Sequence, residues 1–329
     1  MKSLVVVGPT ASGKSSVALE VARRRRVAGQ PTEIVSCDSM AVYRGMDIGT
    51  ATPSPAVRSE VPHHLVDVVD PSEEYSVSAF TEQVRSVLDD LRERGVHAVL
   101  VGGTGLYVRA VTDGLVPPPR YPEVAEQLEA EPDTSVLLAR LERLDPLAAS
   151  RIPAGNRRRV VRALEVTIGS GRPFSSAGPG LDVYPPTPFV QVGLDVPRDV
   201  LAARIRARYD AQLEQGFVDE VRSLAATGPS RTAREALGYR ELLGYLRGES
   251  TLDEAVATAV VRTRRFAVRQ ERWFRRDPRI TWFAATEFDP ATLAARIDTH
   301  WSAASTADDR GTFDGRDGDH RRAEGRDPT

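Results

Sequence analysis

The chain has 329 residues, a single cysteine and a formal net charge of −2, with 44 basic and 46 acidic side chains. This balance excludes a basic field over the whole molecule, so any contact with nucleic acid has to come from local patches. One cysteine excludes a disulfide framework, no apolar run reaches membrane-spanning length, and nothing resembles a secretion signal, so we expect a cytoplasmic protein. The length predicts about two domains, or one domain with an insertion.

A phosphate-binding loop is predicted near the N-terminus. Leu4–Val7 is a short apolar run rich in valine, which is typical of a buried parallel strand. The residues that follow it match the G-x-x-x-x-G-K-[ST] pattern of phosphate loops: Gly8, Pro9, Thr10, Ala11, Ser12, Gly13, Lys14 and Ser15. A helical pattern then continues to Arg26. Strand, glycine-rich turn and helix therefore follow one another in the order that a phosphate site requires.

The chemistry of this loop depends on its backbone and on two side chains. Glycines let successive N–H groups face one concavity, and the helix start adds unpaired N–H groups and the positive end of its dipole. Lys14 brings a mobile positive charge, and Ser15 can offer its hydroxyl to Mg²⁺. Lys2 is the only other lysine, and the remaining long cationic side chains are arginines. This usage indicates that Lys14 is needed as a slim point charge.

A carboxylate is predicted opposite the loop. Glu33–Ser36 is a second short strand, and Asp38 follows its carboxyl end. Ligands of open parallel sheets bind at this edge, so we expect Asp38 to face the phosphate loop. An Asx turn or a helix cap is the alternative for an aspartate at this position. Cys37 beside it is expected to be a small buried apolar residue.

The third predicted strand, Ala98–Val101, ends in glycines and a threonine rather than in an aspartate. NTPases of the motor and GTPase type usually carry an aspartate there that helps to hold Mg²⁺. The carboxylate of the site must therefore come from elsewhere, and Asp38 is the nearest candidate. Thr104 lies at a predicted helix start, where a simple N-cap is the alternative to a role in the site.

The alternation of strands and helices is interrupted after a run of prolines at residues 117–119. Short charged helices follow, and a glycine- and proline-rich connector then leads back to the main body. We therefore expect an all-helical insertion over residues 117–185. It interrupts a phosphate-loop core formed by residues 1–116 and 186–300, and the family resemblance given below implies that the insertion binds tRNA and that the core is catalytic.

Two predicted helices carry arginines that can contact nucleic acid. One lies in the insertion, and its arginines share a face that suits either binding or simple solvation. The other is a long helix over Leu252–Arg276, in which arginines are interleaved with aromatic residues that can stack on bases or pack into the core. The arginines concerned are Arg158, Arg159, Arg162, Arg265 and Arg269.

The C-terminal part returns to the core. Phe189–Leu194 is a predicted core strand, the helix after it carries Arg208, and Ile280–Phe283 is a predicted edge strand. Beyond Trp301 apolar residues nearly vanish, and we expect a disordered tail over residues 302–329.

Several ordered segments resemble one family, the tRNA dimethylallyltransferases, also called tRNA isopentenyltransferases. The segments are residues 8–15; Asp38-Ser39 followed by Tyr43-Arg44-Gly45-Met46-Asp47-Ile48-Gly49-Thr50-Ala51; Gly102-Gly103-Thr104-Gly105-Leu106-Tyr107; Asn156 with Arg159 and Arg162-Ala163-Leu164-Glu165; Gly238-Tyr239-Arg240; and Arg269-Gln270 with Trp273-Phe274-Arg275. The resemblance implies an α/β fold like that of P-loop NTPases, with a parallel sheet flanked by helices and an inserted helical domain. It implies transfer of a dimethylallyl group from dimethylallyl diphosphate to the exocyclic amine of the adenosine beside the tRNA anticodon.

The resemblance also implies residue roles. Asp38 matches the general base, Thr104 contacts the substrate near the reacting amine, and Arg208 matches the arginine that holds the diphosphate. Mg²⁺ is the implied cofactor, held partly by Ser15, the anticodon stem-loop is the implied partner, and we expect a monomer. We expect the following residues to touch tRNA, the last two of which belong to the long helix over Leu252–Arg276: Asp38, Ser39, Met40, Ala41, Thr104, Ala125, Arg158, Arg159, Arg162, Arg265 and Arg269. Of these, Ala125 stands where a basic residue is expected.

Three alternatives use the same loop. A small-molecule or nucleoside kinase would take ATP as donor, and Asp38 would activate a hydroxyl group. An RNA-binding protein could use a nucleotide as a switch. A related enzyme could prenylate free adenine nucleotides, although the long arginine-bearing insertion favours a tRNA acceptor.

Overall fold

The computed structural model describes residues 2–178 and 180–311, with side chains up to Thr306. Its centre is a six-stranded sheet of order β3-β2-β4-β1-β5-β6, in which every neighbouring pair is parallel. The strands are β1 Ser3–Val7, β2 Thr32–Ser36, β3 His63–His64, β4 His97–Gly102, β5 Phe189–Asp195 and β6 Thr281–Ala284. All five predicted strands are confirmed, and the short edge strand β3 is an addition. The predicted α/β class is therefore correct.

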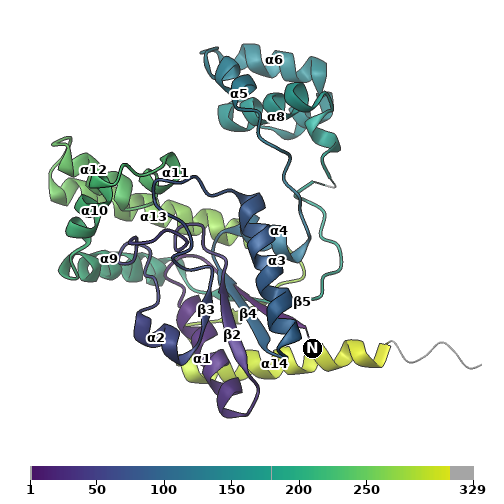
Figure 1. Ribbon diagram of the computed structural model, residues 1–329, viewed down its shortest axis with the longest axis vertical. Coiled ribbons are helices and arrows are strands. Elements are labelled where there is room, and N and C mark those ends of the chain that lie inside the picture. Colours follow the sequence, from purple (N-terminus) through teal and green to yellow (C-terminus); the bar gives the residue numbers. More distant parts are fainter. Residues whose placement is uncertain (1, 179, 312–329) are drawn as a thin grey trace, which may run out of the picture.

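Alternate residues of the central strand enter different cores. Leu4 and Val6 belong to an apolar cluster with α1 (Lys14–Val27) and α14 (Pro290–Gly311), whereas Val5 and Val7 belong to a cluster on the other face. That second cluster includes residues of α3 (Val77–Glu93) and α4 (Gly105–Thr112). Both faces are covered by helices, as the near-continuous apolar strands predict (Figure 1).

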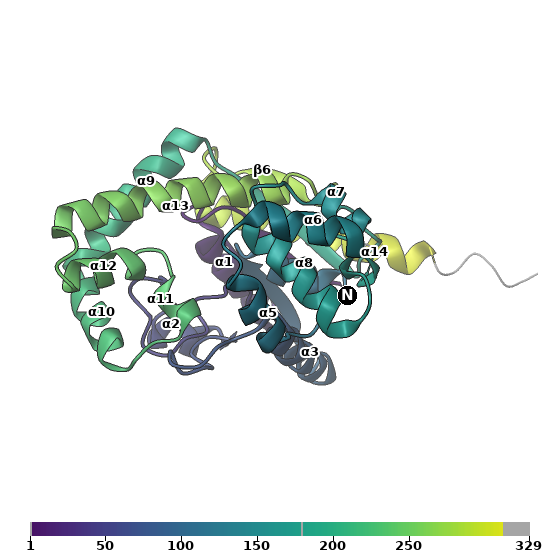
Figure 2. The same ribbon diagram turned by 90° about the horizontal axis from the view of Figure 1, so that it is seen from above.

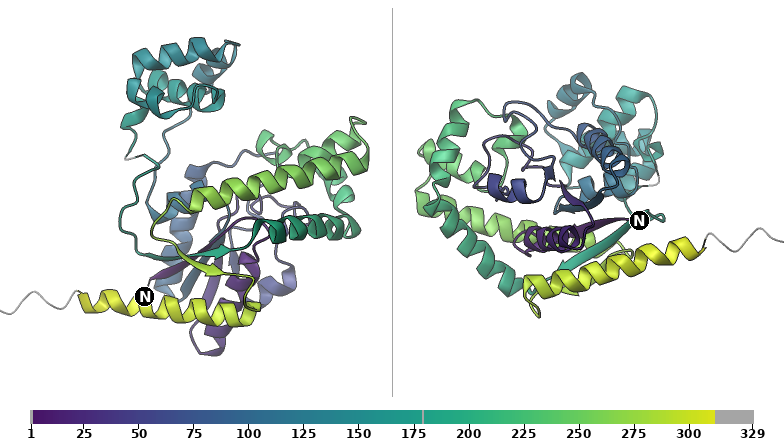
Figure 3. Two further views of the ribbon diagram at one scale, coloured as in Figure 1. Left: turned by 180° about the vertical axis from the view of Figure 1, so that it is seen from behind. Right: turned by 60° about the horizontal axis from the view of Figure 1, so that its bottom comes forward.

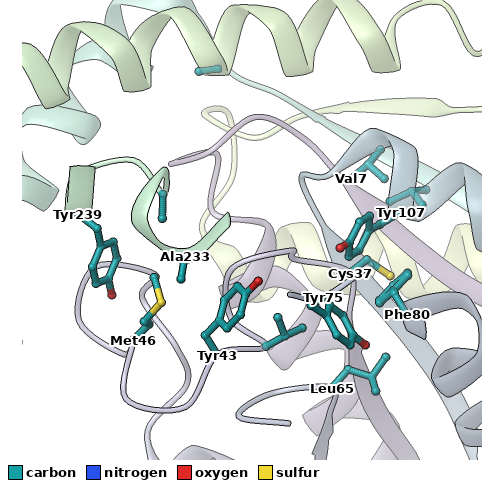
Figure 4. Packing of buried hydrophobic residues seen from close by; sticks show 14 of the residues in the cluster. Val7, Cys37, Tyr43, Met46, Leu65, Tyr75, Phe80, Tyr107, Ala233 and Tyr239 are labelled. Atoms are coloured by element: carbon teal, nitrogen blue, oxygen red, sulfur yellow. The ribbon is translucent and has the colours of Figure 1, made fainter. Parts of the chain in front are cut away.

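Helices from the second half of the chain extend this core beyond the sheet. They are α9 Arg198–Glu214, α10 Phe217–Ala226, α11 Arg231–Arg234, α12 Tyr239–Leu246 and α13 Leu252–Phe274. The segment after β2, which also holds α2 (Pro55–Glu60), packs against them. Figure 4 shows Tyr43 and Met46 of this segment lying between Ala233 and Tyr239 on one side and Tyr75 on the other.

The region between β4 and β5 contains a separate group of helices. They are α5 Pro122–Glu129, α6 Thr134–Leu144, α7 Pro146–Arg151, α8 Arg157–Ser170 and the 3₁₀ turn η1 Phe174–Ser176. These helices have their own apolar cluster, which includes Leu141, Val160 and Leu164. Two extended connectors join this group of helices to the core (Figure 3). Seen from above, the group lies on one side of α1, and α10 and α12 lie on the other side (Figure 2).

The predicted start of a disordered tail at residue 302 is wrong. Helix α14 continues to Gly311, so residues 302–311 are helical. Trp301 is fully buried, its indole N–H donates to the Lys2 carbonyl over 2.6 Å, and the Arg25 guanidinium lies 3.5 Å from its ring centroid. Packing against α1 therefore holds the helix in a stretch whose composition is mostly small and polar. The rest of the predicted tail, residues 312–329, lies outside the described residues. No described helix is long and apolar enough to cross a membrane.

Candidate functional site

The phosphate loop connects β1 to α1 at the carboxyl edge of the sheet. Gly13 has φ 88° and turns the chain into the helix, which begins at Lys14. Ala11 also lies in the left-handed region, with φ 64°, and such strain in a residue with a side chain is typical of functional loops. The Lys14 ammonium reaches back over the loop and donates to the Pro9 carbonyl over 3.4 Å. The predicted order of strand, loop and helix is therefore present.

One cavity of about 560 Å³ at this edge is lined by residues from several loops and helices. Thr10 of the phosphate loop, Asp38 after β2, Thr104 before α4 and Arg208 of α9 all line it. The three residues expected to act in catalysis thus share one cavity with the phosphate loop, although they are far apart in the sequence.

Asp38 makes the Asx turn that was its alternative interpretation and also faces the cavity. Its Oδ1 accepts a hydrogen bond from the Met40 N–H over 2.8 Å. That bond fixes the carboxylate, and the second oxygen is left to act on a ligand. A local turn and a functional role therefore coexist in one side chain. Cys37 beside it is fully buried, and burial raises the pKa of its thiol to about 12.

Thr104 occupies the N-cap position of α4, but its hydroxyl does not cap the helix. Instead its Oγ1 accepts from the Ser39 N–H and donates to the Ser39 Oγ, both over 3.3 Å. The loops after β2 and β4 are thereby joined by side-chain hydrogen bonds. The simple N-cap interpretation of Thr104 is therefore wrong.

Two cations lie close to the phosphate loop, Lys14 and Arg208, and Arg208 also lines the cavity. Burial lowers the pKa of Lys14 to about 8, although Asp38 acts in the opposite direction. Burial also lowers the pKa of Arg208. The Arg208 guanidinium donates from Nη1 to the Thr10 hydroxyl over 2.9 Å, and its Nε is buried without a partner. An anionic ligand would restore the electrostatic stabilisation that burial removes from both side chains.

Gln270 of α13 is a site residue to which neither the sequence pattern nor the resemblance assigned a role. Its Oε1 accepts from the Thr10 N–H, and its Nε2 donates to the Gly103 carbonyl, both over 2.8 Å. It therefore ties the phosphate loop to the loop after β4. A Cβ at Gly103 would lie 2.3 Å from Gln270 Nε2, so a side chain there would push the Gln270 amide away from its hydrogen-bonding position. Gln270 shares a buried helix face with Ala267 and Phe274, and a polar residue on such a face needs partners.

Glu220 of α10 is a second residue that the sequence did not indicate. Its carboxylate accepts from three consecutive N–H groups, those of Asp47, Ile48 and Gly49, over 2.7 to 3.1 Å, and from the Tyr239 hydroxyl. Gln212 of α9 donates to two carbonyls of the same loop. Because Gly49 and Tyr239 line the cavity, Glu220 and Gln212 fix one of its walls.

The arginines expected to bind nucleic acid are placed differently from one another. Arg158 of α8, with Arg265 and Arg269 of α13, lines the cavity, and Ser39 and Met40 line it as well. Arg159 is exposed on α8 without lining the cavity. Arg162 donates to the carbonyls of Pro118 and Pro119 and pairs with Glu165 over 2.7 Å. Ala41 is buried, and Ala125 is half-buried on α5.

The described residues contain no cluster of side-chain ligands for the metal predicted at Ser15. Among the described residues no three His, Cys, Asp or Glu side chains are grouped to hold an ion. Ser15 is exposed at the first turn of α1. This donor set suits an ion that takes most of its oxygen ligands from a bound diphosphate and from water, as Mg²⁺ commonly does.

Fold and site together define a class of protein. A phosphate loop on a parallel sheet faces a fixed carboxylate and two cations, an arrangement that suits group transfer from a phosphorylated donor. The family model described as IPP transferase matches residues 41–277. The chain therefore belongs to the IPP transferase family and is a transferase.

Individual relatives agree with this assignment. A tRNA dimethylallyltransferase of Kineococcus radiotolerans is 48% identical over 301 residues, which cover 89% of this chain and 94% of the relative. One of Thermobifida fusca is 49% identical, over 85% of this chain and 88% of the relative. The crystal structure of the tRNA isopentenylpyrophosphate transferase of Bacillus halodurans superimposes with a TM-score of 0.69 at 36% identity, over 94% of this chain and 99% of that one.

Proposed function

We propose that this protein transfers the dimethylallyl group of dimethylallyl diphosphate to the exocyclic N6 amine of the adenosine next to the anticodon in tRNA. The observation that supports this most is the shared cavity, which is lined by Thr10 of the phosphate loop and by Asp38, Thr104 and Arg208. The names of the relatives support the same reaction. They favour it over the kinase alternative.

The diphosphate end of the donor binds at the phosphate loop. The primary allylic carbon bears a diphosphate that leaves readily once its charge is neutralised. Lys14 and Arg208 supply two positive charges close to the loop, and they stabilise the charge that builds on the diphosphate as the C–O bond breaks. When Mg²⁺ is bound, with Ser15 as one ligand, it supplies further charge neutralisation.

The acceptor amine needs help because its lone pair is delocalised into the adenine ring. As the nitrogen attacks the allylic carbon, a C–N bond forms, the C–O bond breaks and the diphosphate leaves. The nitrogen gives up one proton to Asp38 as general base. Oδ1 of Asp38 is held by the Met40 N–H, which orients the carboxylate. Thr104 lines the same cavity and is proposed to contact the amine.

The tRNA binds over the arginine-lined rim. The target base is stacked in the anticodon loop, so it has to be extruded into the cavity, which costs a few kcal/mol. Contacts to the RNA backbone from Arg158, Arg265 and Arg269 at the cavity, and from Arg159 beyond it, offset this cost. Met40 and Ala41 belong to the same segment as Asp38, and Ala125 adds no charge. Action as a monomer in the cytoplasm is part of the proposal.

The test is mass spectrometry of tRNA nucleosides after incubation of unmodified tRNA with the protein, dimethylallyl diphosphate and Mg²⁺. We expect one adenosine per tRNA to gain a five-carbon group, at the position beside the anticodon. Unmodified tRNA, together with transfer of the ATP γ-phosphate to a small molecule, would contradict the proposal.

A further inference from the structure

The connectors of the helical insertion meet the core at one buried polar cluster. Asp113, which follows α4, lies at its centre, and its side chain is 1% exposed. Arg109 donates from Nε to Oδ2 of this carboxylate, and Arg279 donates from Nη1 to Oδ1 over 2.7 Å. Arg279 also binds Asp277 through two hydrogen bonds of 2.8 and 2.6 Å. Two arginines thus face two carboxylates, which balances the charges that burial would otherwise make costly.

The same two arginines hold the returning connector by its backbone. The Nη atoms of Arg109 donate to two carbonyls of this connector over 2.8 and 2.7 Å, and Arg279 donates to a third over 2.6 Å. These carbonyls are those of Leu181, Val183 and Pro185. The Tyr184 ring lies against both guanidinium groups, with its centroid 4.5 Å from Arg109 Cζ and 5.5 Å from Arg279 Cζ. The cluster therefore binds both connectors at once.

The outgoing connector is also fixed at its far end, by α8. Arg162 donates to the Pro118 and Pro119 carbonyls over 2.6 and 3.1 Å. The Tyr121 N–H donates to Glu165 over 2.8 Å, and Glu165 pairs with Arg162. Only the short stretch between Asp113 and Pro118 lies outside these anchors, so the direction of the insertion depends on the anchors.

Two helices join this cluster to the reacting groups. Helix α4 begins beside Thr104 and ends beside Asp113, a distance of roughly 12 Å along its axis. Helix α13 carries Gln270, which binds the phosphate loop, and Asp277 follows the helix end by three residues. Helices are stiff on this length scale, so the cluster and the cavity are parts of one rigid frame.

We propose that Arg109 and Arg279 are positioning residues, which set the direction of the insertion relative to the catalytic edge and so bring Arg158 to the rim of the cavity that holds Asp38. Neither arginine touches the substrate. The part of this inference that concerns tRNA rests on the proposed function, whereas the part that concerns the insertion does not.

The first experiment measures the placement of the insertion without any substrate. Spin labels on cysteines introduced by Glu82→Cys on α3 and Glu142→Cys on α6 occupy exposed positions of core and insertion. Cys37 is fully buried, so it escapes labelling. Pulsed electron paramagnetic resonance then gives the distance distribution between the two labels. The parent protein is expected to give one narrow distribution.

Two variants and a control decide the outcome. Arg279→Met removes the arginine partner of Asp277 and leaves Asp113 with Arg109 alone, which can impair folding. Tyr184→Leu instead removes the ring that lies against both arginines and keeps every charge. We expect a broadened distribution with a displaced mean in both. Arg26→Met, at an exposed position of α1, makes the same charge change and should give the parent distribution. A parent-like distribution in Tyr184→Leu, or in a folded Arg279→Met, would overturn the proposal.

The second experiment separates placement from general damage. In Tyr184→Leu the KM for tRNA should rise about tenfold, while the KM for dimethylallyl diphosphate stays within about twofold of the parent value. Equal changes in both constants, or none, would contradict a positioning role. A protein that shows the altered label distances yet prenylates no RNA would leave the placement argument standing and refute the proposed function alone.

Discussion

The catalytic edge and the helical insertion are held in place in different ways. At the edge, side chains of α9, α10 and α13 hydrogen-bond the loops directly, with Gln270 joining two loops and Glu220 binding three consecutive N–H groups of a third. The insertion has its own apolar core and meets the edge through two connectors anchored at one polar cluster. The reacting groups are thus fixed from several sides, whereas the orientation of the insertion depends on few contacts.

Variants in the two regions should therefore impair different steps of the reaction. Variants of the loops that hold Asp38 and Thr104 should slow transfer and leave tRNA binding intact, because these loops carry the proposed reacting groups. Variants of exposed arginines on the insertion should weaken tRNA binding and leave the chemical step intact.

The largest effect is expected for Asp38→Ala. Loss of the general base should slow single-turnover transfer by about 10²- to 10⁴-fold. Binding of tRNA, measured by filter retention, should stay within about twofold of the parent, because the arginines that contact RNA are untouched. Single-turnover transfer within a few-fold of the parent rate would refute the assignment of the base.

The next effect is a pH dependence at Lys14. Its pKa is lowered to about 8, mainly by burial, so the side chain is a cation below pH 8 and loses its charge as the pH rises. Diphosphate binds best to the cation, and kcat/KM for dimethylallyl diphosphate should therefore fall about tenfold per unit above pH 8. In Lys14→Arg the charge persists and this fall should disappear. A parent profile that stays flat to about pH 10 would contradict a lowered pKa of Lys14 that governs diphosphate binding.

Gln270→Leu tests the link between two loops. The Thr10 N–H and the Gly103 carbonyl lose their partner, so the loops should separate slightly and kcat should fall about tenfold. Thermal unfolding should show a loss of about 1–3 kcal/mol for the unpaired buried groups. Gln30→Leu, an exposed position after α1, serves as the matched control. Unchanged kcat in Gln270→Leu would mean that the link is dispensable.

The smallest effect separates two arginines of α8. Arg159 is exposed, so Arg159→Ala should weaken tRNA binding and reduce the slope of log affinity against log salt by about one. Arg162 instead binds the connector carbonyls, and Arg162→Ala should leave that slope unchanged. A salt slope unaffected by Arg159→Ala would rule out its contact with a phosphate.

Features that depend on local pattern could be predicted from the sequence. The apolar runs and the glycine-rich loop gave the strands, the phosphate site and the place of Asp38, because strand ends in a parallel sheet meet at one edge. The roles expected for Arg208 and Thr104 came from a resemblance, and both residues line the cavity.

Features that depend on distant partners could not be predicted. Gln270 binds Thr10 from 260 residues away, and Glu220 binds a loop more than 170 residues before it. Glu220 belongs to no local motif. Gln270 stands in one of the segments that resemble the family, but the resemblance assigned it no role, and only its position on a buried helix face indicated that it needs a partner. The length of α14 was missed for a similar reason, since Arg25 and the Lys2 carbonyl at the other end of the chain hold Trp301.

The most direct measurement follows both halves of the donor in one reaction. Unmodified tRNA is incubated with the protein, Mg²⁺, ATP labelled in its γ-phosphate, and dimethylallyl diphosphate labelled in its alkyl and phosphate parts. We expect one diphosphate released for each alkyl group that enters RNA, with the ATP intact. Consumption of the γ-phosphate while the RNA stays free of alkyl label would contradict the account.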